Sequence, residues 1–274
     1  MIKTISFIFF GVILGLILKN NINFIKFLKL IIFSILLPYV VVVEISSTDL
    51  KEEWFGFFWG AGFVIFIFYL VRIVLKEDRN KSALFATAEG GTLGFIVYNI
   101  INTEPISLFF IIDMLGNGGA LFLFIYYQIN KQRKVLDFVK NPLIISMIIG
   151  MLLNFLGMKL LDADFLYRVE PTIIALLVLL VCIILGSEIK WNISKEIFTS
   201  EIFIKFWTLR VGGMFVSLML QLPLAVVILF LLPPSFLLPL FYDKGDKNGI
   251  YASNFIISAL PVFVFLAALL ILFY

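Results

Sequence analysis

Histidine is absent from this sequence of 274 residues, and cysteine occurs once, as Cys182 within an apolar run. Imidazole and thiolate groups are common zinc ligands and common partners in nucleophilic catalysis. Their scarcity excludes intrachain disulfides, Cys-rich or His-rich metal sites and Cys-His nucleophiles. No acid pair with metal-binding spacing and no serine motif with a partner base takes their place. The sequence therefore predicts no enzymatic activity, no cofactor and no metal site.

Charged side chains are also scarce, at 14% of residues, whereas 62% of residues are hydrophobic and the mean hydropathy is +1.11. Soluble domains contain about 25% charged residues and about 45–50% apolar residues. This composition predicts a multi-pass protein of the cytoplasmic (plasma) membrane, in contact with the lipid bilayer. The net charge of +3 does not predict a nucleic-acid partner, because the few basic residues flank apolar segments.

Ten apolar segments along the chain are predicted to cross the membrane as helices. A crossing takes about 20 apolar residues, and several of these segments are shorter than that. The predicted segments are Ile5–Leu18, Phe24–Val43, Trp54–Leu75, Ser82–Ile101, Ile106–Tyr127, Leu143–Leu160, Thr172–Gly186, Ile202–Leu220, Leu224–Tyr242 and Ile250–Phe273.

The basic residues are distributed unevenly among the connections between these segments. Sixteen of the 21 Lys and Arg residues fall in or beside the odd-numbered connections, against four in the even-numbered connections and the termini. Cytoplasmic connections carry the excess of Lys and Arg. The odd-numbered connections are therefore predicted to be cytoplasmic and both termini to lie outside.

The longest polar connection separates the fifth segment from the sixth and divides the chain into two halves. We predict a first five-helix repeat over residues 1–130, a cytoplasmic connecting loop over 131–141 and a second five-helix repeat over 142–274. Because five is odd, the second repeat must enter the membrane from the opposite side to the first. Inverted repeats of this kind are typical of secondary transporters.

Two segments in matching positions of the repeats carry residues that interrupt helices. The ninth segment contains Pro233 and Pro234, and the fourth contains Gly90, Gly91 and Gly94. Proline lacks an N–H group and clashes with the preceding turn, and the backbone groups freed in hydrocarbon need partners. The predicted fold is thus an all-α membrane protein of ten transmembrane helices in two inverted repeats, with broken helices 4 and 9 crossing near the bilayer centre.

Candidate binding residues surround these interruptions. A carboxylate such as Glu89 near the centre of a crossing costs at least about 2.5 kcal/mol. It can therefore be a proton or cation site, or a neutral group bonded to a helix carbonyl. The three glycines can expose N–H groups to an anion or serve as packing residues. Ser235 follows the two prolines, and the same substrate or ion site is predicted to include it.

Other polar residues lie within apolar segments and have two interpretations each. Asp113 and Asn117, four residues apart on one helix face, can face the site or form an interhelical hydrogen bond, and Ser253 and Asn254 in the tenth segment have the same alternatives. Arg210 should pair with a carboxylate such as Glu89 or Asp113, bind an anionic substrate, or extend to the interface. Pro38 predicts a kink of the second segment.

Several of these motifs together resemble the auxin efflux carrier family of permeases. The residues that carry the resemblance are Pro233-Pro234, the later run Tyr251-Ala-Ser-Asn-Phe-Ile-Ile-Ser258, and Asn141-Pro142-Leu143 with its continuation to Gly157. The sequence departs from the family in the fourth segment, where Glu89 stands at an Asn position and Ile96 at a Pro position. The resemblance implies a scaffold domain, a transport domain, elevator-like motion and small organic anions as substrates.

The predicted function is therefore a secondary transporter, a permease or efflux carrier, that moves a small organic anion by alternating access with H+ or Na+ as coupling ion. The runner-up is a sodium-coupled organic anion symporter of the bile-acid type, which also has an inverted-repeat fold and would use Glu89 or Asp113 as ion ligands. A membrane subunit without transport activity is a third alternative. The sequence leaves a homodimer open, and it does not identify the substrate.

Overall fold

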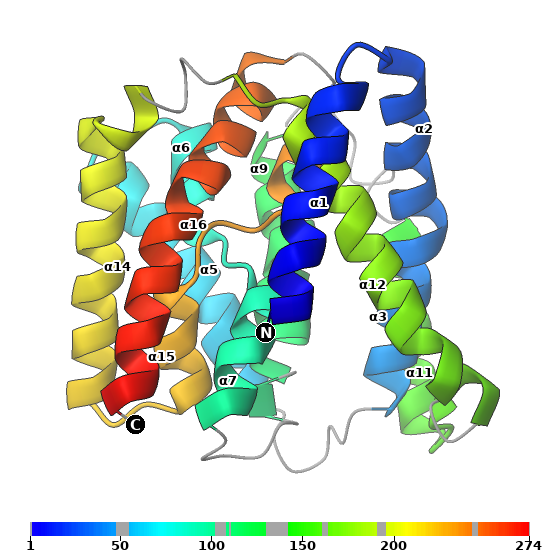
Figure 1. Cartoon of the computed structure of the whole chain (residues 1–274). Helices are drawn as coiled ribbons and strands as arrows, with labels where there is room; N and C mark the ends of the chain where they lie inside the picture. Colours follow the sequence, from blue (N-terminus) through cyan, green and yellow to red (C-terminus); the bar gives the residue numbers. More distant parts are fainter. Residues whose placement is uncertain are drawn as a thin grey trace. The chain divides into compact units, whose positions relative to one another are not determined.

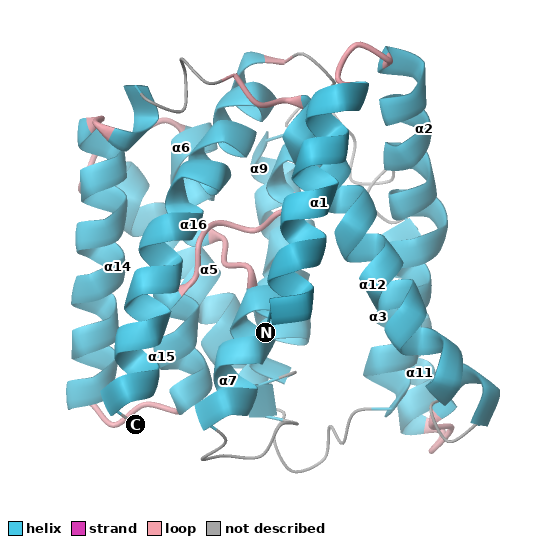
Figure 2. Ribbon diagram, in the orientation of Figure 1, coloured by secondary structure: helices cyan, strands magenta, loops and turns pink. Residues whose placement is uncertain are grey.

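The structure is a computed structural model that describes residues 2–47, 55–101, 108–109, 111–129, 142–160, 164–190, 196–242 and 246–273. Within these residues it contains helices and connecting loops and no strand (Figure 2). The prediction of an all-α protein is confirmed. The predicted connecting loop 131–141 lies outside the described residues.

Four of the described helices are long and apolar enough to cross a membrane. They are Ile22–Ser47, Gly56–Ile73, Glu201–Met219 and Lys247–Leu272, and shorter apolar helices cover Ile144–Phe155 and Thr172–Ser187. These helices support a membrane protein. Many large apolar side chains on them are exposed, such as Phe66 at 63% and Phe265 at 64%, as expected for surfaces that face lipid.

The chain forms two compact units, and each unit takes helices from both halves of the sequence. Unit 1 contains Met1–Glu52 and Tyr126–Glu188, and unit 2 contains Glu53–Ile125 and Ile189–Tyr274. The compact units therefore cut across the two sequence repeats predicted at 1–130 and 142–274. The crossing segments predicted from Gly90 and Pro233 both belong to unit 2.

Unit 1 is held together by two close helix pairs. Helix α1 (Ile2–Leu18) packs on α12 (Asp164–Ser187), and α3 (Leu37–Ser47) packs on α11 (Pro142–Phe155) (Figure 1). A Cβ atom at Gly15 or Gly186 would overlap the backbone of the opposite helix, so these glycines permit the close approach. The remaining described helices of the unit are α2 (Ile22–Ile31), η1 (Ile32–Leu36) and α9 (Tyr126–Ile129).

The helix type changes locally before Pro38, the residue at which a kink was predicted. Residues Ile32–Leu36 form a π-helical turn that ends two residues before Pro38, and the Leu37 N–H group donates to the carbonyl of Ile32. A π turn adds a residue to the helix and so changes which carbonyl meets each N–H group. The helix continues through the proline as α3, which ends at Ser47.

Unit 2 contains the remaining described helices. They are α5 (Gly56–Ile73), α6 (Arg79–Ala86), η2 (Gly90–Gly94), α7 (Phe95–Ile101), η3 (Ile111–Gly118), η4 (Leu121–Ile125), α14 (Glu201–Met219), α15 (Leu224–Leu231), η6 (Leu238–Phe241) and α16 (Lys247–Phe273). Helix α5 packs closely on the π-helical η3, where a Cβ at Gly60 would overlap the carbonyl of Ile112. Aromatic rings join α14 to α16, with Phe206 and Phe255 centroids 5.2 Å apart.

Helices α6 and α15 start at opposite ends of α14. Lys205 near the start of α14 pairs with Glu77 just before α6, with 3.6 Å between Nζ and Oε1. Helix α15 instead begins after the far end of α14, beyond a tight turn in which Gln221 has a φ of 52°. The side chain of Asp78 caps α6 by accepting from the N–H groups of Asn80 and Lys81. The two helices therefore run toward the interior of unit 2 from opposite ends (Figure 1).

Candidate functional site: the crossing of two interrupted helices

The first interruption separates α6 from η2. Helix α6 ends at Ala86, Thr87 is extended with φ −92° and ψ 148°, and η2 begins at Gly90. No proline causes this break, and the extended backbone leaves the carbonyls of Thr87 and Ala88 without helical donors. Both residues are buried, so protein groups must supply the hydrogen bonds.

The second interruption separates α15 from η6. Helix α15 ends at Leu231, and Leu232 is extended with φ −73° and ψ 148°. Proline disfavours the helical conformation of the residue before it, which explains why Leu232 leaves the helix at Pro233. The chain resumes helical structure at Leu238, with Pro239 in the first turn, where a missing N–H group costs nothing.

The two interruptions contact each other through their backbones, and we call this contact the crossing. The Glu89 N–H group donates to the carbonyl of Pro233 over 3.0 Å. In the other direction, Ser235 N–H donates to Oγ1 of Thr87 over 3.3 Å. Figure 2 shows the two loop segments side by side between the helices of unit 2. The crossing thus satisfies backbone groups that hydrocarbon cannot satisfy.

Glu89 is the acidic residue of the crossing and is 8% exposed. Its Oε2 atom accepts the N–H group of Phe236 over 2.7 Å and the hydroxyl of Ser235 over 3.4 Å. The carboxylate of one interruption is therefore held by a backbone N–H group and a hydroxyl group of the other. Sequence analysis singled out Glu89 and Ser235, and the structure brings them together with Pro233 and Pro234.

Arg210 on α14 is 1% exposed and contacts both interruptions. Its guanidinium donates to the carbonyl of Leu229 over 2.7 Å and to the carbonyl of Thr87. Among the described residues it forms no ion pair, so the expected pairing with Glu89 or Asp113 is wrong. The physical reason is that the interruptions create carbonyl acceptors, which occupy the guanidinium.

Asp113 and Asn117 on η3 hold the first interruption from another side. Asn117 Nδ2 donates to the carbonyl of Ala88 and to Oδ1 of Asp113, each over 2.9 Å. A Cβ atom at Gly90 would overlap the Asp113 carboxylate, so this carboxylate lies against the backbone beside Glu89. Asn117 therefore bonds the first interruption itself, and Asp113 lies beside the same interruption.

The remaining glycines of the fourth segment differ in their contacts. A Cβ atom at Gly94 would lie 2.9 Å from Leu232 and from Phe109, so Gly94 packs beside the second interruption. The N–H group of Gly94 donates to the carbonyl of Glu89 over 3.2 Å. Gly91 lies within the π-helical η2. Among the described glycines only Gly157 has a positive φ. Glycine is therefore required at positions 90 and 94 because a Cβ atom would be too close to neighbouring side chains, and backbone conformation is not the reason.

Ser253 and Asn254 lie on α16 and are fully buried. Oδ1 of Asn254 accepts the N–H group of Lys190 over 2.8 Å, and its Nδ2 donates to the carbonyl of Ile250 over 2.7 Å. These bonds tie the start of α16 to the segment before residue 191. The hydroxyl of Ser253 has no hydrogen-bond partner in the part of the chain that the structure describes.

Charges at the crossing match the local helix ends. Helices α6 and α15 both end there, and the C-terminal end of a helix carries partial negative charge. Arg210 lies at these ends, whereas Glu89 accepts the N–H group of Phe236, which follows the prolines of the second break. Sequence analysis missed Thr87 and Leu229 as partners. The sequence did contain a signal for Leu229. In a helix its carbonyl would accept the N–H group of residue 233, four positions later, and proline has no N–H group there.

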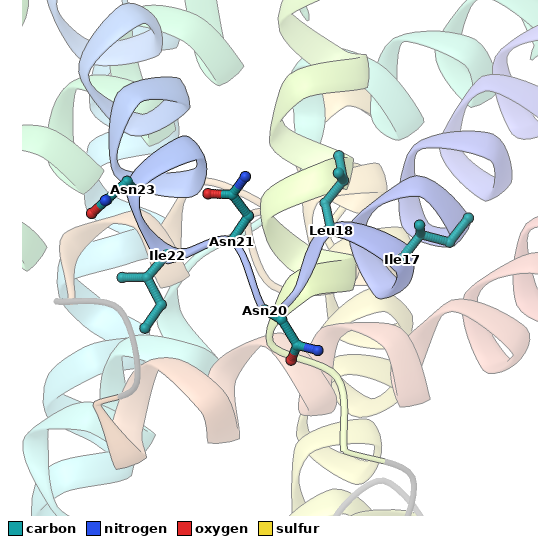
Figure 3. Close-up of a pocket in the computed structure, with 6 residues that line it drawn as sticks. All are labelled: Ile17, Leu18, Asn20, Asn21, Ile22 and Asn23. Atoms are coloured by element: carbon teal, nitrogen blue, oxygen red, sulfur yellow. The ribbon is translucent and has the colours of Figure 1, made fainter.

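A surface hollow of about 600 Å³ lies in unit 1, at the turn between α1 and α2 (Figure 3). None of the described residues that line it is charged, and the described residues of the crossing all belong to unit 2. The hollow therefore adds nothing to the site at the crossing. Its lining consists of Ile17, Leu18, Asn20, Asn21, Ile22 and Asn23.

The geometry of the crossing defines a candidate site for a small solute or ion: two carboxyl groups and one guanidinium in a buried region where two helices stop. Comparison with known proteins does not add a family to this description. No protein-family model matches the sequence, and no curated protein matches it.

Proposed function

We propose that this protein is a secondary active transporter that moves a small organic anion across the cytoplasmic membrane by alternating access. The observation that supports this most strongly is the hydrogen bond of 3.0 Å between Glu89 N–H and the Pro233 carbonyl, because it joins two interrupted helices directly. Interrupted helices in membrane proteins are tolerated where the backbone is buried in protein or lines a cavity, and pairs of them form the binding sites of many secondary transporters. A subunit with only a structural role has no need of two such interruptions in contact.

The proposal includes ten transmembrane helices in two inverted repeats, residues 1–130 and 142–274. In this arrangement the fourth segment corresponds to the ninth, and these are the segments that contain the two interruptions. Their opposite directions in unit 2 agree with repeats of opposite orientation. The division into two compact units supports an elevator-like motion, with unit 2 as the transport domain and unit 1 as the scaffold.

The charges at the crossing favour coupling to a cation. Glu89 and Asp113 would repel an organic anion, and Arg210 is already bonded to the carbonyls of Leu229 and Thr87. A proton or a cation bound with the carboxyl groups would reduce this repulsion. Coupling to H+ or Na+ therefore follows from the residues at the site.

A sodium-coupled symporter of the bile-acid type is the second candidate. The observation that favours it is a group of oxygen atoms, because hard cations prefer oxygen ligands. Glu89 and Asp113 each contribute a carboxylate. Oδ1 of Asn117 is buried and lacks a hydrogen-bond partner within the described residues. These atoms belong to adjacent segments of unit 2.

Flux measurements in proteoliposomes test the proposal. The purified protein should transport at least one member of a panel of dicarboxylates, aromatic acids and bile acids, and the rate should respond to a pH or sodium gradient. Absence of flux for every substrate and gradient would indicate a subunit without transport activity. Stimulation by sodium alone would favour the symporter.

Glu89→Gln tests the coupling site. Glutamine keeps an acceptor oxygen for the Phe236 N–H group but cannot carry a charge, so the variant should fold and lose the pH dependence of flux. Glu201→Gln is the matched control, because Glu201 is exposed and bonds Lys205 at the start of α14. A wild-type pH profile in Glu89→Gln would exclude Glu89 as the proton site.

A further inference from the structure

Pro233 leaves one carbonyl of α15 without its helical donor. In an α-helix the N–H group of residue i bonds the carbonyl of residue i−4. The Leu232 N–H group bonds the carbonyl of Ile228 over 3.2 Å, and the next donor would belong to residue 233, where proline has none. Leu229 has an exposed fraction of 0%, so water does not reach this residue from the surface.

The Arg210 guanidinium supplies the missing donor. One of its NH₂ groups donates to the Leu229 carbonyl over 2.7 Å, and the other donates to the carbonyl of Thr87 at the end of α6. These two carbonyls come from different interruptions, far apart in the sequence. A single side chain thus joins the C-terminal ends of the two broken helices.

The surroundings of Arg210 suit a permanent internal cation. The rings of Phe63 and Phe206 lie on the guanidinium, each with its centroid 5.0 Å from Cζ. Ring faces and helix C-terminal ends both stabilise positive charge. A planar guanidinium can donate to two carbonyls at once, whereas a lysine ammonium is a point charge on a flexible stem.

We infer that Arg210 is a positioning residue, which replaces the amide hydrogen that Pro233 lacks and locks the two interruptions to each other. In terms of the proposed function, on which this last step rests, the crossing then moves as one body. Arg210 is bound to the protein backbone throughout and is not a ligand of the transported anion. The stability that Arg210 contributes to the folded protein should therefore depend on which residue occupies position 233.

A double-mutant cycle measures this dependence. Arg210→Met keeps an apolar stem between the rings but removes both donors. Pro233→Ala restores an N–H group and allows α15 to extend by one residue toward the Leu229 bond. We expect Arg210→Met to lower the unfolding temperature in detergent, and the loss to be at least halved in the Pro233→Ala background, because one of two carbonyls regains a donor.

Pro261→Ala provides the matched control, because Pro261 also lies inside a helix of unit 2 but is exposed to the surroundings. The effects of Arg210→Met and Pro261→Ala should add. Amide hydrogen exchange of residues 84–90 and 228–237 should rise together in Arg210→Met, and that of residues 228–232 should fall again in the double variant with Pro233→Ala. Equal losses of stability in the wild-type and Pro233→Ala backgrounds would overturn the inference.

If Arg210→Met yields too little folded protein for an unfolding measurement, the yield of folded protein becomes the measurement. Recovery of folded protein in Arg210→Met/Pro233→Ala supports the inference, and failure of this double variant while Pro233→Ala alone folds contradicts it. The cycle does not depend on transport. Coupling between Arg210 and Pro233 without wild-type flux would refute the proposed function alone, and flux without coupling would refute the positioning role alone.

Discussion

At the scale of single residues, space determines which side chains the crossing accepts. Gly90 has no Cβ, and the Asp113 carboxylate occupies the position where a Cβ would lie. From the sequence, the glycines of the fourth segment were predicted to expose N–H groups to an anion or to serve as packing residues. The contact with Asp113 supports the packing role for Gly90, which is not among the described residues with positive φ.

Gly90→Ala should therefore destabilise the protein and separate η2 from η3. Overpacking of a tight contact costs about 1–3 kcal/mol, and here the methyl group would also displace a carboxylate. The measurement is the unfolding temperature in detergent together with flux in proteoliposomes. Gly62→Ala on α5 is the control, because no atom lies within 4 Å of a Cβ at that position. Equal changes of unfolding temperature and flux in Gly90→Ala and Gly62→Ala would contradict the contact between Gly90 and Asp113.

At the scale of elements, polar side chains bond carbonyls at helix ends. Asn154 on α11 donates to the carbonyls of Ile45 and Ser46, over 2.9 Å and 3.2 Å. These carbonyls lie in the last turn of α3, where the helix itself provides no donors. In unit 2, Asn117 and Arg210 serve the ends of α6 and α15 in the same way.

Asn154→Leu should loosen the end of α3 while leaving other helices intact. The substitution keeps the volume but removes donors from buried carbonyls, at a cost of about 1–3 kcal/mol. Hydrogen exchange of residues 42–47 should increase, and that of α14 should not change. Asn20→Leu, at an exposed position in the turn after α1, is the control and should change neither. Unchanged exchange at 42–47 would show that other groups hold this end.

At the scale of the whole molecule, the distribution of Lys and Arg predicts the orientation in the membrane. The connection after the first segment is predicted to be cytoplasmic and the one after the eighth to be outside, because the odd-numbered connections carry most of the basic residues. The single native thiol, Cys182, is buried, so introduced cysteines can report on sidedness.

In a Cys182→Ser background, Leu220→Cys should react with a membrane-impermeant maleimide on intact cells. Asn20→Cys should react only after the membrane is permeabilised. Both positions are exposed, so accessibility within the protein does not limit either reaction. Equal labelling of the two cysteines in intact cells would mean that the number of crossings between them is even, against the predicted count.

The sequence alone determined the all-helical, membrane-compatible class and the places of the two interruptions, because hydropathy, glycine and the missing N–H group of proline act locally. It also indicated Glu89, Asp113 and Asn117 as polar groups in apolar surroundings. Only the tertiary structure decided their partners: Arg210 bonds carbonyls where a carboxylate was expected, and helices from both halves combine in each compact unit. The bonds from Arg210 to Thr87 and from Phe236 to Glu89 join residues more than a hundred positions apart, and local patterns do not specify which distant donor reaches a free acceptor.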